Sequence, residues 1–462
     1  MKPQLLPLIA ATALLGGCAS LVPARDATTA PLREDFRVTA TPTAAAAAAT
    51  HEWDGFFADA RLRDVVGIAL AGNRNLQASA AAVERVRAQY RIAEAGRLPG
   101  VNAGAAANRQ QSGGSTSTSY SASLGLAAWE IDLFKRLASL EGAALARFAA
   151  QQETQRSAQL SLVAEVATAW LALAAERQRL TLALQLRDNQ QRTLDLTEQR
   201  HRLGAASGLD LARARTAFEA ARGEAMRAQA AVTQARLQLE LLAGQPLPDA
   251  LLPAAQDLQP VTALPAIPAG LPAEVLLQRP DLRAAEQQLQ AAAFDVGAAR
   301  AARFPRLTLT ASAGTRAPEL DGLFNSGTGF WSLLPQLDLP LFDAGSRAAQ
   351  VQVSEASRRQ ALATYEATLQ AAFREVADAL AVRDSLAERL DAQQAQVAAA
   401  AQSLRFAQES YRLGSSSQLD LLDAQRQLAT AQQALVTLRQ TEQVNRVTLL
   451  RALGGRWVAT GG

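Results

Sequence analysis

The sequence predicts a mainly α-helical protein with a small β part, in which one structural plan occurs twice in tandem. Segments 137–202 and 346–413 are rich in Ala, Gln, Glu, Arg and Leu and nearly free of glycine and proline. Each far exceeds the usual helix of about 11–12 residues. Short stretches of alternating apolar and polar residues precede both segments and predict strands. The phrase RLGAASGLD at 202–210 recurs as RLGSSSQLD at 412–420, which indicates an internal duplication.

The composition offers little for nucleic-acid binding or catalysis. Among 462 residues, 46 Lys and Arg stand against 43 Asp and Glu, without the clustered basic patches of a nucleic-acid binder. The chain has two histidines, one cysteine and no GxSxG, Walker or HExxH motif. We therefore expect no enzyme activity, no cofactor, no metal site and no nucleic-acid partner.

The N-terminus reads as a lipoprotein signal. Lys2 precedes an apolar run, Leu5 to Leu15, and the sequence LGGC ends at Cys18. This pattern predicts a signal peptide over 1–17 and acylation of Cys18, for example with palmitate, as the anchor of an N-terminal tether over 18–50. Ala19 follows the cysteine in place of Asp, which indicates the outer membrane. The alternative is an incidental cysteine in an ordinary signal peptide.

The first repeat is expected over 51–243. A helix over 70–97 leads into two strands within about 100–131, with QQSGGSTSTS at 110–119 as the loop between them. The long helix then runs to the tip at 202–210, and a return helix ends near Ala243. The two long helices must lie antiparallel, because only the short tip joins them.

The second repeat, over 273–455, follows the same order. We expect a helix over 274–303, two strands within about 306–341, the tip at 412–420 and a return helix to Leu453. RAPELDGLFNSG reads as the loop between its strands. The proline-rich stretch 244–272 is predicted to be an equatorial linker around the helices, and 456–462 a C-terminal tail.

Both tips carry the same capping signals. A glycine after the last helical turn favours a left-handed cap, and an arginine in that turn faces the negative end of the helix dipole. A serine followed by an aspartate at the third position has the form of a capping box for the next helix. These residues are Arg202, Gly204, Ser207 and Asp210 in the first tip and Arg412, Gly414, Ser417 and Asp420 in the second.

The strands raise the question of a membrane. No run of 18 apolar residues follows the signal peptide, so no spanning helix is expected. Strands cross a lipid bilayer only in closed barrels, and such barrels usually have at least eight strands. Three chains with four strands each predict a homotrimer with a twelve-stranded barrel, and their helices would form a tube. Aromatic residues at the strand ends suit either an interfacial girdle or packing against the helices: Trp129, Phe134, Phe330 and Trp331.

Taken together, these features resemble the TolC/OprM family of outer-membrane channels. The resemblance covers roughly residues 50–455 and includes the duplicated halves, the Arg-Leu-Gly tips and LDLLDAQRQLA at 419–429. It implies a trimeric α-barrel continuous with a twelve-stranded transmembrane β-barrel. The implied function is the outer-membrane channel of a multidrug efflux or type I secretion system. The lipoprotein signal favours the branch that serves resistance–nodulation–division pumps.

The resemblance also implies site residues. Leu419 would form an apolar constriction, Asp423 a ring of carboxylates and Arg426 a partner for an acidic group. The alternative for Asp423 and Arg426 is a surface ion pair worth a few tenths of a kcal/mol. The tips, Arg202-Leu203-Gly204 and Arg412-Leu413-Gly414, would contact a periplasmic adaptor that connects the channel to an inner-membrane pump.

Two competing interpretations belong to other classes of protein. The first is a lipid-anchored periplasmic coiled-coil adaptor or scaffold, although adaptors usually carry additional β domains. The second is a carboxylate-based hydrolase on an extended stalk, for which the sequence shows no pocket signature. A type I protein secretion channel remains the alternative within the channel class.

Overall fold

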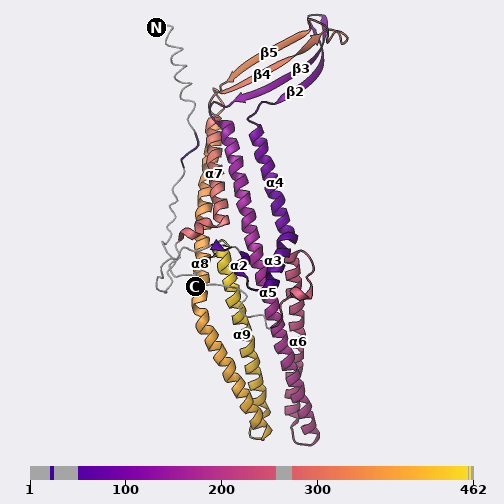
Figure 1. Cartoon of the computed structure of the whole chain (residues 1–462), viewed down its shortest axis with the longest axis vertical. Coiled ribbons are helices and arrows are strands. Elements are labelled where there is room, and N and C mark those ends of the chain that lie inside the picture. The colour runs from indigo at the N-terminus through magenta and orange to yellow at the C-terminus, as the bar shows by residue number, and fades with distance from the viewer. Residues whose placement is uncertain (1–20, 25–49, 52, 256–272, 456, 459–462) are drawn as a thin grey trace. The chain divides into compact units, whose positions relative to one another are not determined.

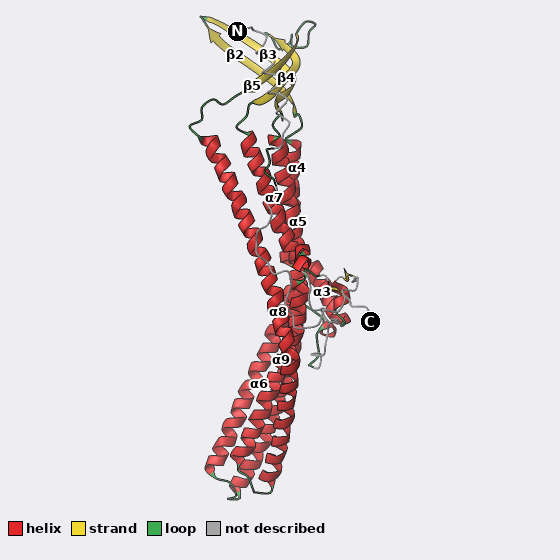
Figure 2. Cartoon of the chain, turned by 90° about the vertical axis from the view of Figure 1, so that its left-hand side faces the viewer, coloured by secondary structure: helices red, strands yellow, loops and turns green. Residues whose placement is uncertain are grey.

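The computed structural model describes residues 21–24, 50–51, 53–255, 273–455 and 457–458, and it is mainly helical with one four-stranded sheet (Figures 1 and 2). This confirms the predicted fold class. Cys18, the signal peptide and most of the tether, linker and tail lie outside the described residues. The helices and strands are α2 Trp53–Phe56, α3 Ala60–Gly72, α4 Arg74–Ala95, β2 Val101–Ser112, β3 Ser115–Ile131, α5 Arg136–Arg202, α6 Gly208–Ala243, α7 Pro280–Ala301, β4 Arg306–Ala317, β5 Gly329–Asp338, α8 Ser346–Arg412 and α9 Gln418–Ala452.

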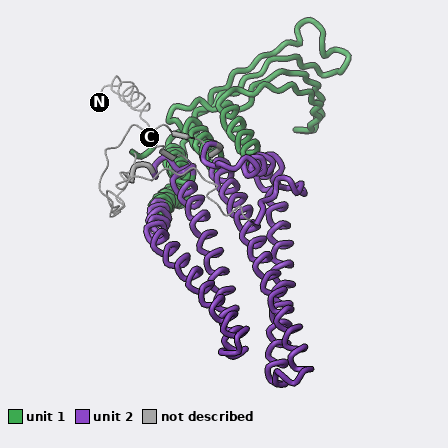
Figure 3. The backbone as a smooth tube through the Cα atoms, turned by 60° about the horizontal axis from the view of Figure 1, so that its bottom comes forward, with its two compact units in different colours: residues 1–30, 81–154, 281–368 green, residues 31–80, 155–280, 369–462 purple. Residues whose placement is uncertain are grey.

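The chain forms two compact units (Figure 3). Of the described residues, unit 1 comprises those within 1–30, 81–154 and 281–368, and unit 2 comprises those within 31–80, 155–280 and 369–462. Unit 1 holds the sheet, and unit 2 holds both helix–helix tips. Because each unit takes segments from both sequence repeats, the duplication does not coincide with the division into units.

The sheet of unit 1 is antiparallel, in the order β2-β3-β4-β5. The expected loop at 110–119 is wrong, because β2 and β3 stay paired until Ser112 faces Ser115. Gly113 and Gly114, with φ of 58° and 84°, make the whole turn. Positive φ at both central residues is what a two-residue type I′ hairpin turn requires, and glycine supplies it without strain.

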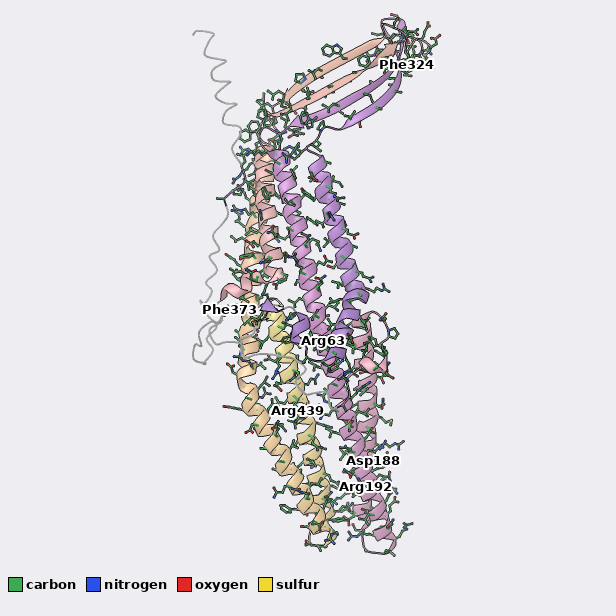
Figure 4. The ribbon with its side chains drawn as sticks, viewed as in Figure 1. Arg63, Asp188, Arg192, Phe324, Phe373 and Arg439 are labelled. Carbon is green, nitrogen blue, oxygen red and sulfur yellow. The ribbon has the colours of Figure 1, made fainter. Side chains whose placement is uncertain are left out.

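The second hairpin keeps a long loop, as expected. β4 ends at Ala317 and β5 begins at Gly329. Phe324 lies in this loop, at the end of the sheet, and is exposed (Figure 4). Between the hairpins, β3 of the first repeat pairs with β4 of the second, from Tyr120 opposite Ala317 to Ile131 opposite Leu307. The sheet is therefore continuous across the duplication.

Two helix boundaries differ from the sequence-based expectation. The helix predicted over 70–97 is broken at Asn73, whose side-chain oxygen accepts a hydrogen bond from the Leu76 amide (3.0 Å) and so starts α4. The helix predicted over 274–303 begins at Pro280 and follows a short 3-10 segment, η3 Ala273–Gln278. Proline suits a first helical position, because its missing amide hydrogen has no partner there.

The glycine that interrupts the first long helix has a packing role within unit 1. A Cβ at Gly142 on α5 would stand 2.9 Å from the ring of Phe294 on α7. The absence of a side chain lets the aromatic ring lie directly against the helix backbone. Glycine here reflects close helix packing.

The main hydrophobic core lies in unit 2, where α3, α5, α6 and α9 meet. Trp170 of α5 is fully buried in it, together with Phe56, Phe57 and Leu62. Leu247 and Leu252 join this core, so the first part of the expected linker packs against the helices. Within this core, the indole N–H of Trp170 donates a hydrogen bond to the Leu251 carbonyl oxygen (3.3 Å).

Within the described chain, α5 alone is long and apolar enough to cross a membrane by length and composition. Of its most apolar stretch, 56% is buried inside the protein, as in the core helix of a soluble domain. The finding is therefore weak evidence for a spanning helix. Two short strands that the sequence analysis did not predict, β1 Thr50–His51 and β6 Trp457–Val458, pair with each other in unit 2.

Candidate channel gate and docking tips

Both tips of unit 2 contain a complete capping box. Ser207 accepts a hydrogen bond from the Asp210 amide (3.1 Å), and the Asp210 carboxylate accepts from the Ser207 amide (3.2 Å) and hydroxyl (2.7 Å). Ser417 and Asp420 repeat this arrangement. Gly204 and Gly414 precede the boxes with φ of 74° and 76°. The boxes fix where α6 and α9 begin.

The start of α9 determines where the gate residues face. Leu419, Asp423 and Arg426 are spaced by four and three residues, so all three share one face of the helix. Leu419 is 45% exposed, and the Asp423 carboxylate pairs with the Arg426 guanidinium at 2.6 Å. The structure therefore contains the ion pair along the helix that the surface interpretation expects, on a face that other chains could approach.

This face lines a groove of about 710 Å³ between α5, α6 and α9. The groove carries charge of both signs: besides the Asp423–Arg426 pair, Glu224 and Arg227 of α6 form an ion pair at 2.5 Å. Its apolar lining includes Leu186 of α5. Mixed charge and an open, partly apolar surface suit contact with another protein surface more than capture of one ion.

Two buried hydrogen bonds hold α9 against α5, and the sequence analysis did not find them. Gln190 donates to the Gln425 side-chain oxygen (3.0 Å), and Gln418 donates to the Thr197 hydroxyl (3.1 Å). In both helices the two polar residues are seven apart, a spacing that could have revealed them. A buried polar residue at a helix–helix seam fixes the register of the pair. These bonds therefore position the helix that carries Asp423.

The tips themselves expose a leucine each. Leu203 is 83% exposed and Leu413 is 70% exposed. Near the tips, the Arg200 guanidinium lies over the Tyr411 ring at 5.1 Å, a cation–π contact that connects α5 with α8. Arg412 pairs with Glu409 at 2.9 Å on its own helix. The two leucines are therefore presented on a supported surface.

The capping boxes predict that strong acid destabilises the first turns of α6 and α9. The Ser207 hydroxyl holds the pKa of Asp210 below its ordinary value of 3.8, and Ser417 does the same to the pKa of Asp420. A lowered native pKa means that the stabilisation is complete above pH 3.8 and is lost as the pH falls through the native pKa. Between pH 7 and 5, amide exchange in the first turns of α6 and α9 should therefore not vary beyond its intrinsic pH dependence.

The variant Ser417→Ala tests the same box at neutral pH. We expect faster amide hydrogen exchange in the first turn of α9 and unchanged exchange in the first turn of α6, because each box acts locally. Ser207→Ala is the matched control with the opposite pattern. Equal exchange in both turns of either variant would contradict the assignment of the boxes.

Within the described residues, no group of three or more His, Cys, Asp or Glu side chains could hold a metal ion. The features that stand out are a strand pair from each repeat, two supported helical tips and a polar face near one tip. They define the class of protein: a mainly helical chain that carries a small antiparallel sheet with two edge strands, β2 and β5.

Comparison with known proteins gives the family. The family model described as outer membrane efflux protein matches residues 65–245 and 271–455. The chain belongs to this family, whose members are outer-membrane channels and not enzymes. The two matched ranges correspond closely to the two repeats inferred from the sequence.

Individual relatives match over nearly the whole chain. The antibiotic efflux pump outer membrane protein ArpC of Pseudomonas putida is 39% identical, over 99% of this chain and 96% of its own. Outer membrane protein OprJ of Pseudomonas aeruginosa is 40% identical, over 97% and 95%. The crystal structure of the open state of the Neisseria gonorrhoeae MtrE outer membrane channel superposes with a TM-score of 0.85 at 35% identity, covering 94% of this chain and 98% of that one. This chain is therefore an efflux channel protein of the outer membrane.

Proposed function

We propose that three copies of this chain form the outer-membrane duct of a tripartite efflux pump. Four strands from each chain would close a twelve-stranded barrel in the membrane, and the long helices would form a tube in the periplasm. The observation that carries the proposal is the open-ended sheet: β2 and β5 are its edge strands, and lipid cannot satisfy an unpaired edge. Pairing β5 of one chain with β2 of the next removes every such edge.

The cargo is proposed to be small organic molecules. Relatives are named for efflux of antibiotics and of toluene, and both match 99% of this chain. These names favour a drug or solvent efflux channel over a type I protein secretion channel. Transport through the duct is passive, and an inner-membrane pump would drive it through a periplasmic adaptor protein.

The gate would be the face of α9 that carries Leu419, Asp423 and Arg426. In a three-fold assembly, three Asp423 carboxylates converge, repel one another and attract cations. Opening is then a shift in the population of α9 positions, favoured by a partner that binds the open form more tightly. The Gln190–Gln425 hydrogen bond supports this role, because it ties the gate helix to α5 at the level of Asp423.

Oligomeric state and conductance test the proposal together. Protein extracted from outer membranes in detergent should have the mass of three chains, and it should produce channels in planar lipid bilayers. Samples heated until the oligomer dissociates serve as the control and should be silent. A monomer that leaves the bilayer electrically silent would overturn the proposal.

The tips are proposed to dock the adaptor, and a double variant tests this role. Leu203→Asp with Leu413→Asp should abolish drug resistance at unchanged channel levels, because a charge replaces the apolar side chain of each tip. The matched control is Ala205→Asp with Ser415→Asp, which adds the same charges to the same loops without removing a leucine. Resistance equal to that of the control would remove the docking role.

A further inference from the structure

A short piece of the N-terminal region is seated on the helices of unit 1. Residues 21–24 lie against α7 and α8, and two arginines hold their backbone. The Arg358 guanidinium of α8 donates to the Ala24 carbonyl (2.7 Å), and that of Arg300 on α7 donates to the Leu21 carbonyl (3.5 Å). Arg300 is itself oriented by an ion pair with Glu355 of α8 (2.8 Å). The two ends of the segment are therefore fixed to both helices.

Between these ends, Val22 fills a notch in α7. A Cβ at Gly297 would stand 2.6 Å from the Val22 Cγ2 atom and 3.2 Å from its Cα atom. Gly297 is buried, and the Ser139 hydroxyl oxygen of α5 lies 3.2 Å from the same Cβ position. The glycine therefore provides room for Val22 on α7 that any other residue would occupy.

The segment also lines a pocket. Val22, Pro23 and Ala24 line a partly open pocket of about 210 Å³, together with Leu289 and Phe294 of α7. Pro23 has no amide hydrogen and a fixed φ, so seating it leaves no donor unsatisfied and costs less chain entropy than another residue would. Two arginine hydrogen bonds, a glycine notch and a largely apolar pocket together make a built site.

We propose that this groove is a binding site for the chain's own segment after Cys18, and that the seated segment holds the lipid anchor to the strand-bearing unit. The second part rests on the acylation of Cys18 that the sequence predicts. Only three peptide steps separate Cys18 from Leu21, and they span at most about 11 Å. The acylated cysteine is then held within that distance of Leu21, close to α7.

Protease kinetics test whether the segment is seated. Arg25 is the first trypsin site after Cys18, and a seated segment must leave the groove before trypsin can bind the residues on its N-terminal side. With the protein extracted from outer membranes in mild detergent, Gly297→Ala should speed cleavage after Arg25 at least about tenfold, while cleavage after Arg37 serves as the internal control. An unchanged rate after Arg25 would overturn the binding site.

A second variant separates displacement of the segment from damage to the helices. Val22→Ala removes the Cγ2 atom that a Cβ at position 297 would meet, but it does not change Ser139. Gly297→Ala combined with Val22→Ala should therefore return cleavage toward the rate of Val22→Ala alone. If the double variant is cleaved as fast as Gly297→Ala, the notch does not hold Val22 and the proposal fails.

Lengthening the connection between Cys18 and Leu21 tests whether the seated segment holds the lipid anchor. Six Gly and Ser residues inserted between Ser20 and Leu21 should slow the appearance of the oligomer after pulse labelling, because the lipid no longer holds the strand-bearing unit at the membrane. The same insertion within the alanine run 44–49 is the matched control and should leave the rate unchanged. Equal rates for the two insertions would overturn the proposal that the seated segment holds the lipid anchor.

Palmitate labelling of Cys18 distinguishes the two parts of the proposal. If Cys18 takes up no palmitate, the predicted acylation is wrong, and so is the proposal that the segment holds the lipid anchor. The protease result stands or fails by itself, as does the channel function tested by conductance.

Discussion

Replacing Trp170 by alanine is expected to lower the free energy of unfolding by about 3–5 kcal/mol, the largest stability change among the variants considered. The side chain is fully buried where α3, α5, α6 and α9 meet, so the alanine variant leaves a cavity in the core. Denaturant titration of the purified protein, followed by far-ultraviolet circular dichroism, measures the loss.

Trp170→Phe is the matched control. Phenylalanine keeps most of the apolar volume but loses the hydrogen bond from the indole N–H to the Leu251 carbonyl, which is worth about 1 kcal/mol. The alanine variant should therefore be clearly less stable than the phenylalanine variant. Equal stability would mean that this core contributes little to the measured transition.

Asp423→Asn is expected to give the largest change in channel properties, a higher conductance with a weaker preference for cations. The substitution removes three converging negative charges from the proposed constriction and the Asp423–Arg426 ion pair from each chain. Single-channel recordings under a salt gradient measure both quantities. Leu419→Ser should also raise conductance, because it removes the apolar part of the constriction.

Asp188→Asn is the control for the gate. Asp188 is an exposed carboxylate on α5 that pairs with its neighbour Arg187 at 2.6 Å (Figure 4). The substitution Asp188→Asn therefore also removes one charge and one ion pair per chain. Its conductance should equal that of the wild type. If Asp423→Asn behaves like this control, Asp423 and Arg426 form only a surface ion pair and the gate lies elsewhere.

What could be predicted from the sequence depended on how local the interaction is. The capping residues Ser207 and Ser417 were predicted because a capping box is complete within four residues. The break at Asn73 was missed because its side-chain amide also donates to the Leu242 carbonyl, a contact between distant parts of the chain. The Gly113–Gly114 turn was local, but its serine- and threonine-rich flanks were interpreted as a loop when they continue the strands.

The candidate site divides in the same way. The spacing of Leu419, Asp423 and Arg426 on one helix face follows from the sequence alone. The contact of Gln190 with Gln425 does not, because it depends on the register of α5 against α9. The contact of Gly297 with Val22 could not be predicted either, because Val22 lies far from Gly297 in the sequence.

The pairing of β3 with β4 has an evolutionary consequence. This seam joins the two repeats by the same backbone hydrogen bonds that the proposed trimer would use between β5 of one chain and β2 of the next. A half-length ancestor with a single hairpin could have closed the same ring from twice as many polypeptides. Fusion of two such copies would place every second seam within one chain, and the two hairpin ends could then differ, as the tight glycine turn and the loop that carries Phe324 do.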